Sequence, residues 1–312
     1  MIVVSILCAV LAYRVNRFRE QHKFATALEE IGGGEVVYRF MQSKDGAVNS
    51  RPPLPGWLGR LAGEFDIVGV KVRLHGRTAP FIQDELRRCV ALRDLTVSGH
   101  EELLTDDFVA TLPLERLRSL HLGSYGLTDD VFEHIKRCGR LRELELSPAV
   151  LMRELYAPSR RAKLTSVSRL GSEQPGSLVG FGLASLSECK KLRVLRIPHN
   201  YINDEGLAEL NCPRLELLDV GHNPLDGSGL IRIHEWKQMH HLNVKGVVLS
   251  DEGVDAIAAC SSLKYLDLTG ASLRGFQTLS DALPNCNIVT AKSWFSARRR
   301  VRAPVPSAGS NP

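Results

Sequence analysis

One apolar pattern recurs along most of this chain and constrains its fold more than any other feature. The pattern is L-x-x-L-x-L, with Ile, Val or Met allowed at the apolar positions, as in LKYLDL from Leu263. Its first positions fall at residues 67, 92, 117, 141, 192, 215, 239 and 263, so the steps are 25, 25, 24, 51, 23, 24 and 24 residues. A fixed period in this range is typical of a solenoid, in which each repeat buries its apolar side against its neighbours.

Two further observations complete the repeat. The step of 51 is about two periods, and KLTSVSRL, ending at Leu170, fits there as a degenerate unit with Arg169 at an apolar position. The second half of several repeats reads as a short helix, as in LTDDVFEHIKRC, INDEGLAELNC and LSDEGVDAIAAC. A strand followed by a helix in every repeat predicts an α/β solenoid with a parallel sheet.

These units resemble leucine-rich repeats of the cysteine-containing, ribonuclease-inhibitor-like type. The resemblance rests on the apolar triplets, the T/S/N-D residues before each helix and the cysteine that ends it, and it covers residues 61–290. It implies a horseshoe with the parallel sheet on the concave face and short helices on the convex face. With its N-terminal segment, the chain also resembles bacterial membrane-anchored leucine-rich-repeat proteins, which implies an interaction role and names no ligand.

The cysteines occupy one position of the repeat. Five of them precede a first apolar position by three residues, and the sixth has the same offset from Val289; they are Cys89, Cys138, Cys189, Cys212, Cys260 and Cys286. The same slot in every repeat indicates a small side chain packed in the core. The alternatives are a disulfide, a metal ligand or a nucleophile, and the column holds no C-x-x-C pair of the zinc type.

Polar residues at the ends of the strands and helices are predicted to support the backbone. Acidic pairs follow four expected N-cap residues, and acids in the first turn favour the helix dipole; these N-caps are Thr105, Thr128, Asn203 and Ser250. Acid–base catalysis or calcium binding is the alternative for the acids. Asn200 and Asn223 each follow the last apolar strand position by three residues and are expected to bond the backbone of the adjacent turn.

No motif indicates catalysis, and we expect no catalytic residue, no metal ligand and no cofactor. HEWKQMHH has Gln238 where a zinc-protease pattern requires its second histidine. Gly32–Gly34 lack the Lys-Ser/Thr of a phosphate loop, and they are interpreted as a break after a helix that ends near Ile31.

The N-terminus differs from the repeats. Residues 1–13 are apolar and are followed at once by Arg14, Arg17 and Arg19, which predicts a membrane anchor or signal-like segment. The positive-inside bias then favours the repeats on the cytoplasmic side. A juxtamembrane helix, a linker and the start of a cap with Trp57, Leu58 and Leu61 are expected over residues 14–60.

The C-terminal residues 291–312 are expected to be a disordered tail, basic at first and then rich in Pro and Ser, and binding of this tail to an acidic lipid surface or a nucleic acid is the alternative. This tail has five basic residues and no acidic one, while the whole chain has a net charge of +5. The rest of the chain is therefore close to neutral, so nucleic-acid binding is not expected.

Function is expected on the concave sheet, where alternate side chains point away from the core. The predicted role is a non-enzymatic protein–protein interaction module, a membrane-tethered scaffold or receptor that binds a protein or peptide. A self-assembling structural protein is the alternative, and an enzyme is a third class. The candidate binding residues are Lys71, His121, Glu143, Glu145, Arg196, Asp219, His241, Asn243, Tyr265 and Asp267.

Overall fold

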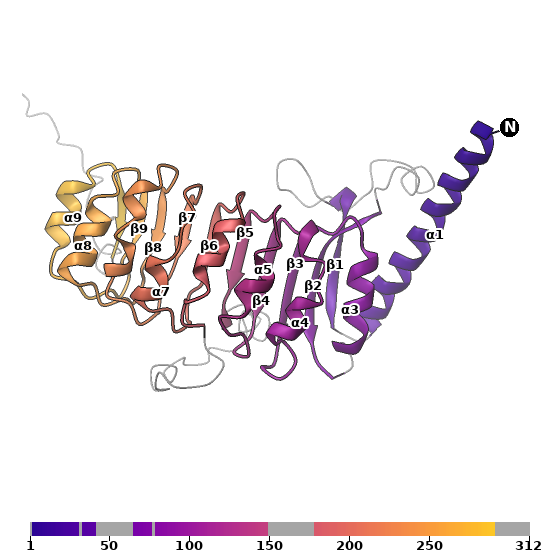
Figure 1. The fold of residues 1–312 in the computed structure, drawn as a ribbon, viewed down its shortest axis with the longest axis horizontal. Coiled ribbons are helices and arrows are strands. Elements are labelled where there is room, and N and C mark those ends of the chain that lie inside the picture. The colour runs from indigo at the N-terminus through magenta and orange to yellow at the C-terminus, as the bar shows by residue number, and fades with distance from the viewer. Residues whose placement is uncertain (1, 31–32, 42–64, 77–78, 149–177, 291–312) are drawn as a thin grey trace, which may run out of the picture.

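The repeats form one continuous sheet in an open arc. The computed structural model describes residues 2–30, 33–41, 65–76, 79–148 and 178–290 (Figure 1). The strands are β1 (Gly34–Tyr38), β2 (Ile67–Leu74), β3 (Asp94–Gly99), β4 (Ser119–Gly123), β5 (Glu143–Leu146), β6 (Val194–Arg196), β7 (Leu217–Asp219), β8 (His241–Asn243), β9 (Tyr265–Asp267) and β10 (Asn287–Val289). They lie in chain order across a ten-stranded sheet, antiparallel between β1 and β2 and parallel in every other pair.

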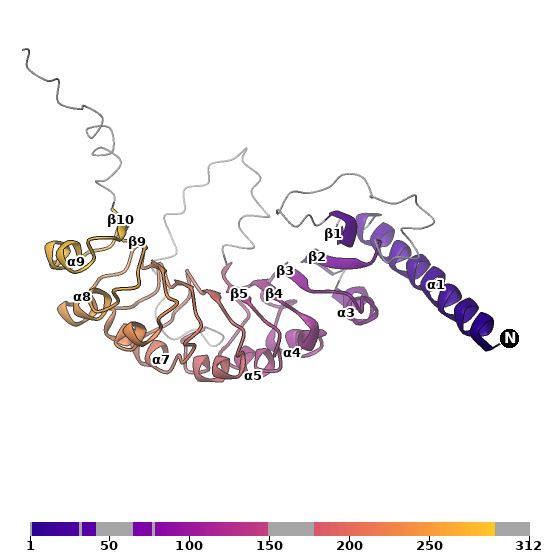
Figure 2. The same ribbon diagram turned by 90° about the horizontal axis from the view of Figure 1, so that it is seen from above.

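Apart from α1, which lies at the N-terminal end, the helices lie on the other side of the arc (Figure 2). The helices are α1 (Ile2–Glu30), α3 (Ala79–Arg88), α4 (Asp106–Ala110), α5 (Val131–Ile135), α7 (Asp204–Ala208), α8 (Asp251–Ala258) and α9 (Phe276–Ala282), with short 3₁₀ turns η1 (Arg39–Met41), η2 (Leu114–Arg116), η4 (Leu183–Glu188), η5 (Ser228–Leu230) and η6 (Ile233–Glu235). Figure 2 shows the strands along the concave side of the arc and the helices from α3 to α9 along its convex side. This is the leucine-rich-repeat horseshoe predicted from the apolar triplets.

The core runs between these two layers and is built from the triplets. In each repeat the three apolar positions are buried, as for Leu117, Leu120 and Leu122, which are all fully buried. The five cysteines of the regular column are buried too, and three of them donate across the stack to the carbonyl of a neighbouring repeat. Cys189 Sγ lies 3.5 Å from the oxygen of Ile135, and Cys212 Sγ lies 3.6 Å from that of Leu186. The packing role predicted for this column is confirmed.

The end of the solenoid departs from the predicted repeat at Cys286. Strand β10 pairs Ile288 with Leu266 and Val289 with Asp267, so Val289 is not a first apolar position. Leu283 is buried, and its carbonyl accepts from the Cys286 N–H as the carbonyl of Cys260 accepts from the Leu263 N–H. The assignment of Cys286 to the cysteine column was therefore wrong, because the last turn is shorter.

The two strands that flank the long step between repeats are neighbours in the sheet. Strand β5 pairs directly with β6, with Glu143 opposite Val194 and Glu145 opposite Arg196. The degenerate repeat predicted around Leu164 lies outside the described residues, but the pairing leaves no place for a strand between β5 and β6. That prediction was wrong, because a step of two periods can also come from an insertion between two adjacent repeats.

Asparagines bond the turns as predicted. Nδ2 of Asn223 donates to the carbonyls of Ile197 and Val220, each at 2.9 Å, and its Oδ1 accepts from the Ile202 N–H at 3.1 Å. Asn200 donates to the carbonyl of Leu146 at 2.8 Å. These bonds satisfy backbone groups that the short strands leave without a sheet partner.

Three of the four predicted N-caps are confirmed. Thr105, Asn203 and Ser250 each accept a backbone N–H from the first turn of the helix that follows. Thr128 does not cap α5, whose N-cap is Asp130. The Thr128 hydroxyl accepts the Asp130 N–H at 3.1 Å, and it also donates to Asp106 Oδ2 at 2.6 Å, so it serves a contact between repeats as well.

In three of the four pairs the first acid, Asp106, Asp129 or Asp204, does more than favour a helix dipole. The carboxylate of Asp129 accepts from the N–H groups of residues 179–181, and that of Asp204 accepts from the N–H groups of Asp226, Gly227 and Gly229. Burial raises the pKa of Asp204, and these N–H groups oppose that rise. These three aspartates thus each bind the backbone of the loop in the next repeat, a role that was not predicted.

The N-terminal end of the solenoid is covered by α1 and β1. Helix α1 is continuous across the predicted boundary at residue 13, and its second half packs on the sheet through Phe24, Ala25 and Leu28, which are all buried. Strand β1 begins within the glycines that were interpreted only as a break, and it pairs with the edge of β2. The predicted cap around Trp57 and the tail from residue 291 lie outside the described residues.

The membrane anchor predicted over residues 1–13 falls in the first half of α1. None of the helices in the described ranges is both long enough and apolar enough to cross a membrane.

Candidate binding surface on the concave sheet

The side chains on the concave face of the sheet form two rows, in which Glu145 is buried and the other residues named below are at least partly exposed. In the first row, register places Glu143, Val194, Leu217, His241 and Tyr265 side by side on consecutive strands. The second row holds Lys71, Thr96, His121, Glu145, Arg196, Asp219, Asn243 and Asp267. Neighbouring strands are about 4.8 Å apart, so the side chains of each row lie next to one another. All ten predicted binding residues lie in these rows.

The middle of the surface is an ion-pair cluster. The Arg196 guanidinium forms a salt bridge with Glu143, although the two residues lie 53 positions apart in the chain. Nε2 of His121 lies 3.7 Å from Glu143 Oε1, and its Nδ1 lies 3.8 Å from Glu145 Oε2. The imidazole of His121 and the guanidinium of Arg196 lower the pKa of Glu143 to about 2. Four of the predicted residues are therefore brought together across β4, β5 and β6.

The C-terminal part of the first row is apolar and aromatic. Val194, Leu217, His241 and Tyr265 are all half-buried, and they follow one another on four strands. The rings of His241 and Tyr265 are stacked, with centroids 4.4 Å apart. Burial lowers the pKa of His241, which favours the neutral imidazole in this stack. Val194 and Leu217 were not among the predicted binding residues, because only the strand register shows that they form one apolar row with His241 and Tyr265.

Beside this row, three polar residues hold the ends of their own strands. Asp219 accepts from the Gly221 N–H at 3.0 Å, Asn243 accepts from the Lys245 N–H at 2.9 Å, and Asp267 accepts from the Thr269 N–H at 2.8 Å. Each is a side-chain turn of the Asx type. These half-buried residues therefore have a structural role as well as a place on the concave face, and a charge reversal there would disturb the loop.

Lys71 stands apart from the other predicted residues. It lies on β2 opposite Glu35 of β1, whereas the ion-pair cluster begins two strands further on at His121. The predicted surface is therefore an acidic and basic centre with an apolar row on one side and a distant lysine on the other.

Comparison with known proteins agrees with the repeat pattern. Residues 188–210 match the family described as leucine-rich repeat. No curated protein matches the chain. Among solved structures, an internalin (inlF) of Listeria monocytogenes is 18% identical and aligns over 66% of this chain and 56% of its own, with a TM-score of 0.43. Internalin C2 (inlC2) of the same organism is 15% identical over 81% of this chain and 91% of its own, with a TM-score of 0.47. The chain thus covers little more than half of the first of these structures and carries a recognised leucine-rich repeat.

Proposed function

We propose that this chain is a non-enzymatic protein–protein interaction module that receives a protein or peptide on its concave sheet. The observation that carries the proposal is the row of Val194, Leu217, His241 and Tyr265, which is half-buried and lies beside polar side chains. Interfaces combine a central apolar and aromatic strip with a polar rim in the same way.

The titratable groups of the surface suit binding better than catalysis. Glu143 is held as a carboxylate by His121 and Arg196, so it is not poised to exchange a proton near neutral pH. The carboxylates of Asp219 and Asp267 already accept backbone N–H groups. A fixed set of charges beside an apolar strip gives orientation and specificity to a docked segment.

The partner that fits this surface is an extended segment with apolar or aromatic side chains. Such side chains would cover Leu217 and the His241–Tyr265 stack, and basic side chains would meet Asp219 and Asp267. The rigid Tyr265 ring is the expected anchor, since tyrosine is among the residues that dominate interface energies.

A random-peptide display library panned against the purified chain tests this proposal. Selected peptides should bind the double variant Leu217→Ser/Tyr265→Ala at least about tenfold more weakly, which corresponds to one lost anchor. The matched control is Phe181→Ala/Ile231→Ala, which removes two exposed apolar side chains outside the concave sheet. Peptides that keep their affinity for the first variant and lose it for the control would place the binding surface elsewhere.

We propose further that the N-terminal half of α1 tethers the module to a membrane, with the repeats on the cytoplasmic side. Ile6, Val10 and Tyr13 are exposed there, which supports insertion of this half into a bilayer surface. Of the basic residues that suggested the orientation, Arg17 also forms a salt bridge with Asp66 at 3.0 Å. Protease treatment of intact cells that express a C-terminally tagged chain tests the orientation, because a protected tag places the repeats inside.

A further inference from the structure

One edge of the horseshoe, where the parallel strands begin, carries a column of arginines. Arg93, Arg118, Arg142 and Arg193 directly precede the first concave row on four consecutive strands. Their backbones are in contact, since the carbonyl of each accepts an N–H from the next. The four side chains therefore leave the same edge at intervals of about 4.8 Å.

The same edge is basic beyond this column. Arg116, Arg140 and Lys191 lie two residues earlier in three of these repeats, and Lys190 lies beside them. Arg116 is the last residue of η2, and the others come after α5 or η4; the C-terminal ends of helices attract cations. Glu216 pairs with Arg193 at 2.9 Å and is a local exception. We call this surface the basic edge, defined by Arg93, Arg118, Arg142, Arg193, Arg116, Arg140, Lys190 and Lys191.

The basic residues crowd one another. The pKa of Arg93 is lowered first by burial and then by the like charges of Arg118, Arg39 and Arg140. Some acids of the repeats lie at the opposite edge, where Asp129 and Asp204 hold the loops before the next helices. The nearly neutral charge of the folded part therefore hides a separation of charge across the horseshoe.

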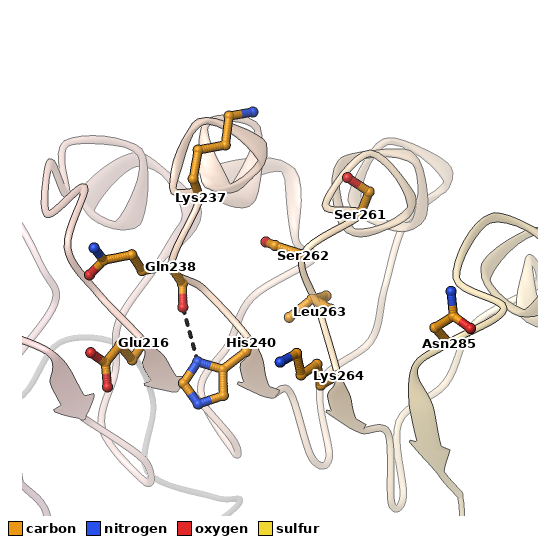
Figure 3. A pocket seen from close by; sticks show the side chains of 9 residues that line it. All are labelled: Glu216, Lys237, Gln238, His240, Ser261, Ser262, Leu263, Lys264 and Asn285. Carbon is orange, nitrogen blue, oxygen red and sulfur yellow. Dashed lines mark hydrogen bonds between the residues drawn. The ribbon is translucent and has the colours of Figure 1, made fainter.

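The basic edge continues into a shallow hollow near the C-terminal end of the solenoid. Lys237, His240 and Lys264 are among the residues that line it, together with Glu216 (Figure 3). Lys264 points toward His240 across the hollow (Figure 3). The polar lining extends the basic edge along the starts of β8 and β9.

Helix α1 projects beyond this same edge. Gln21 accepts from the Ile67 N–H at 3.1 Å, and Arg17 pairs with Asp66, so both side chains lie at the start of β2. The part of α1 before Arg17, about 22 Å long at 1.5 Å per residue, therefore leaves the body of the solenoid near this edge. Figure 1 shows this end of α1 leaving the body of the solenoid. It carries the exposed apolar residues Ile6 and Val10.

We infer that the basic edge binds an anionic lipid surface and sets the orientation of the horseshoe on it. Phosphate headgroups would meet the arginine column while the apolar part of α1 enters the outer part of the same leaflet, a combination typical of interfacial proteins. The inference rests on the proposed membrane tether, because the tether is the reason for choosing a lipid surface over a nucleic acid as the anionic partner. A nucleic acid would use the arginines but would have no use for Ile6 and Val10 on the same side.

Vesicle co-sedimentation of the full chain tests the inference. The chain should bind vesicles of phosphatidylcholine mixed with phosphatidylglycerol and should bind phosphatidylcholine alone much more weakly. The variant Arg118→Gln/Arg142→Gln removes two exposed charges from the column and should weaken binding to the anionic vesicles by about thirtyfold. The matched control Lys245→Gln/Arg274→Gln removes two exposed charges from the opposite edge and should bind as the parent does.

A second variant separates this inference from the tether. Ile6→Ser/Val10→Ser changes exposed residues of α1 and leaves the arginine column intact. If only this variant loses binding, the tether stands and the basic edge is not the lipid surface. If only Arg118→Gln/Arg142→Gln loses binding, the basic edge stands and the tether fails. Tighter binding of the parent chain to a short single-stranded RNA than to the anionic vesicles would overturn the choice of lipid.

Discussion

The buried Asn223 side chain should contribute more to the stability of the solenoid than any surface ion pair. Replacement by alanine leaves the Ile202 N–H and the carbonyls of Ile197 and Val220 without the partner that each has now. Ile202 is fully buried and Asn223 is 5% exposed, so water reaches these groups poorly. A buried group without a partner costs about 1–3 kcal/mol, so we expect Asn223→Ala to lower the free energy of unfolding by about 3–4 kcal/mol.

The matched variant is Asn200→Ala, at the same position of the preceding repeat. Asn200 is half-buried and donates to two carbonyls, those of Leu146 and Pro198, so we expect a loss of about 1–2 kcal/mol. Urea unfolding of both variants gives the comparison, provided that the denaturant slope is unchanged. If Asn223→Ala costs no more than Asn200→Ala, burial does not set the strength of these bonds and the reasoning is refuted.

Two other outcomes follow from the titratable groups. The pKa of Glu143 is lowered to about 2 from 4.5, so its contribution to stability is complete above about pH 4.5 and is lost as the pH falls toward 2. Because the side chain is 34% exposed, we expect the free energy of unfolding to fall by about 1 kcal/mol over this range. Urea unfolding at several pH values measures this loss, which should be absent in Glu143→Gln. Burial raises the pKa of Cys212 to about 12, whereas Cys8 is exposed, so a thiol reagent at neutral pH should label Cys8 at once and Cys212 only on unfolding. Rapid labelling of Cys212 in the folded chain, measured by peptide mass, would contradict its packing role.

The repeat period predicted the strands well because each triplet is a local pattern. Leu117, Leu120 and Leu122 lie within six residues, and the alternation that buries them also determines which neighbours face outward. The residues of the two concave rows could therefore be predicted from the triplets alone. Strand β1 could not, because it has no triplet and its place depends on an antiparallel pairing with β2.

Contacts between residues far apart in the sequence could not be predicted either. The Asp129 carboxylate and the Gly180 N–H are 51 positions apart, and no sequence pattern near either residue indicates their hydrogen bond. The first acid of each pair was therefore interpreted within its own helix alone. The basic edge was missed for a different reason, since net charge sums over a molecule and conceals where the charges lie.

The direct pairing of β5 with β6 has a consequence for the evolution of this sequence. Glu143 and Arg196 are in contact at this point although they are 53 positions apart in the sequence. A break in the chain between them would leave intact the sheet bonds, this ion pair and the bonds of Asp129 to the next loop. The horseshoe is thus suited to exist as two complementary fragments, and new sequence can be gained or lost at this joint while the pairing of the two halves is kept.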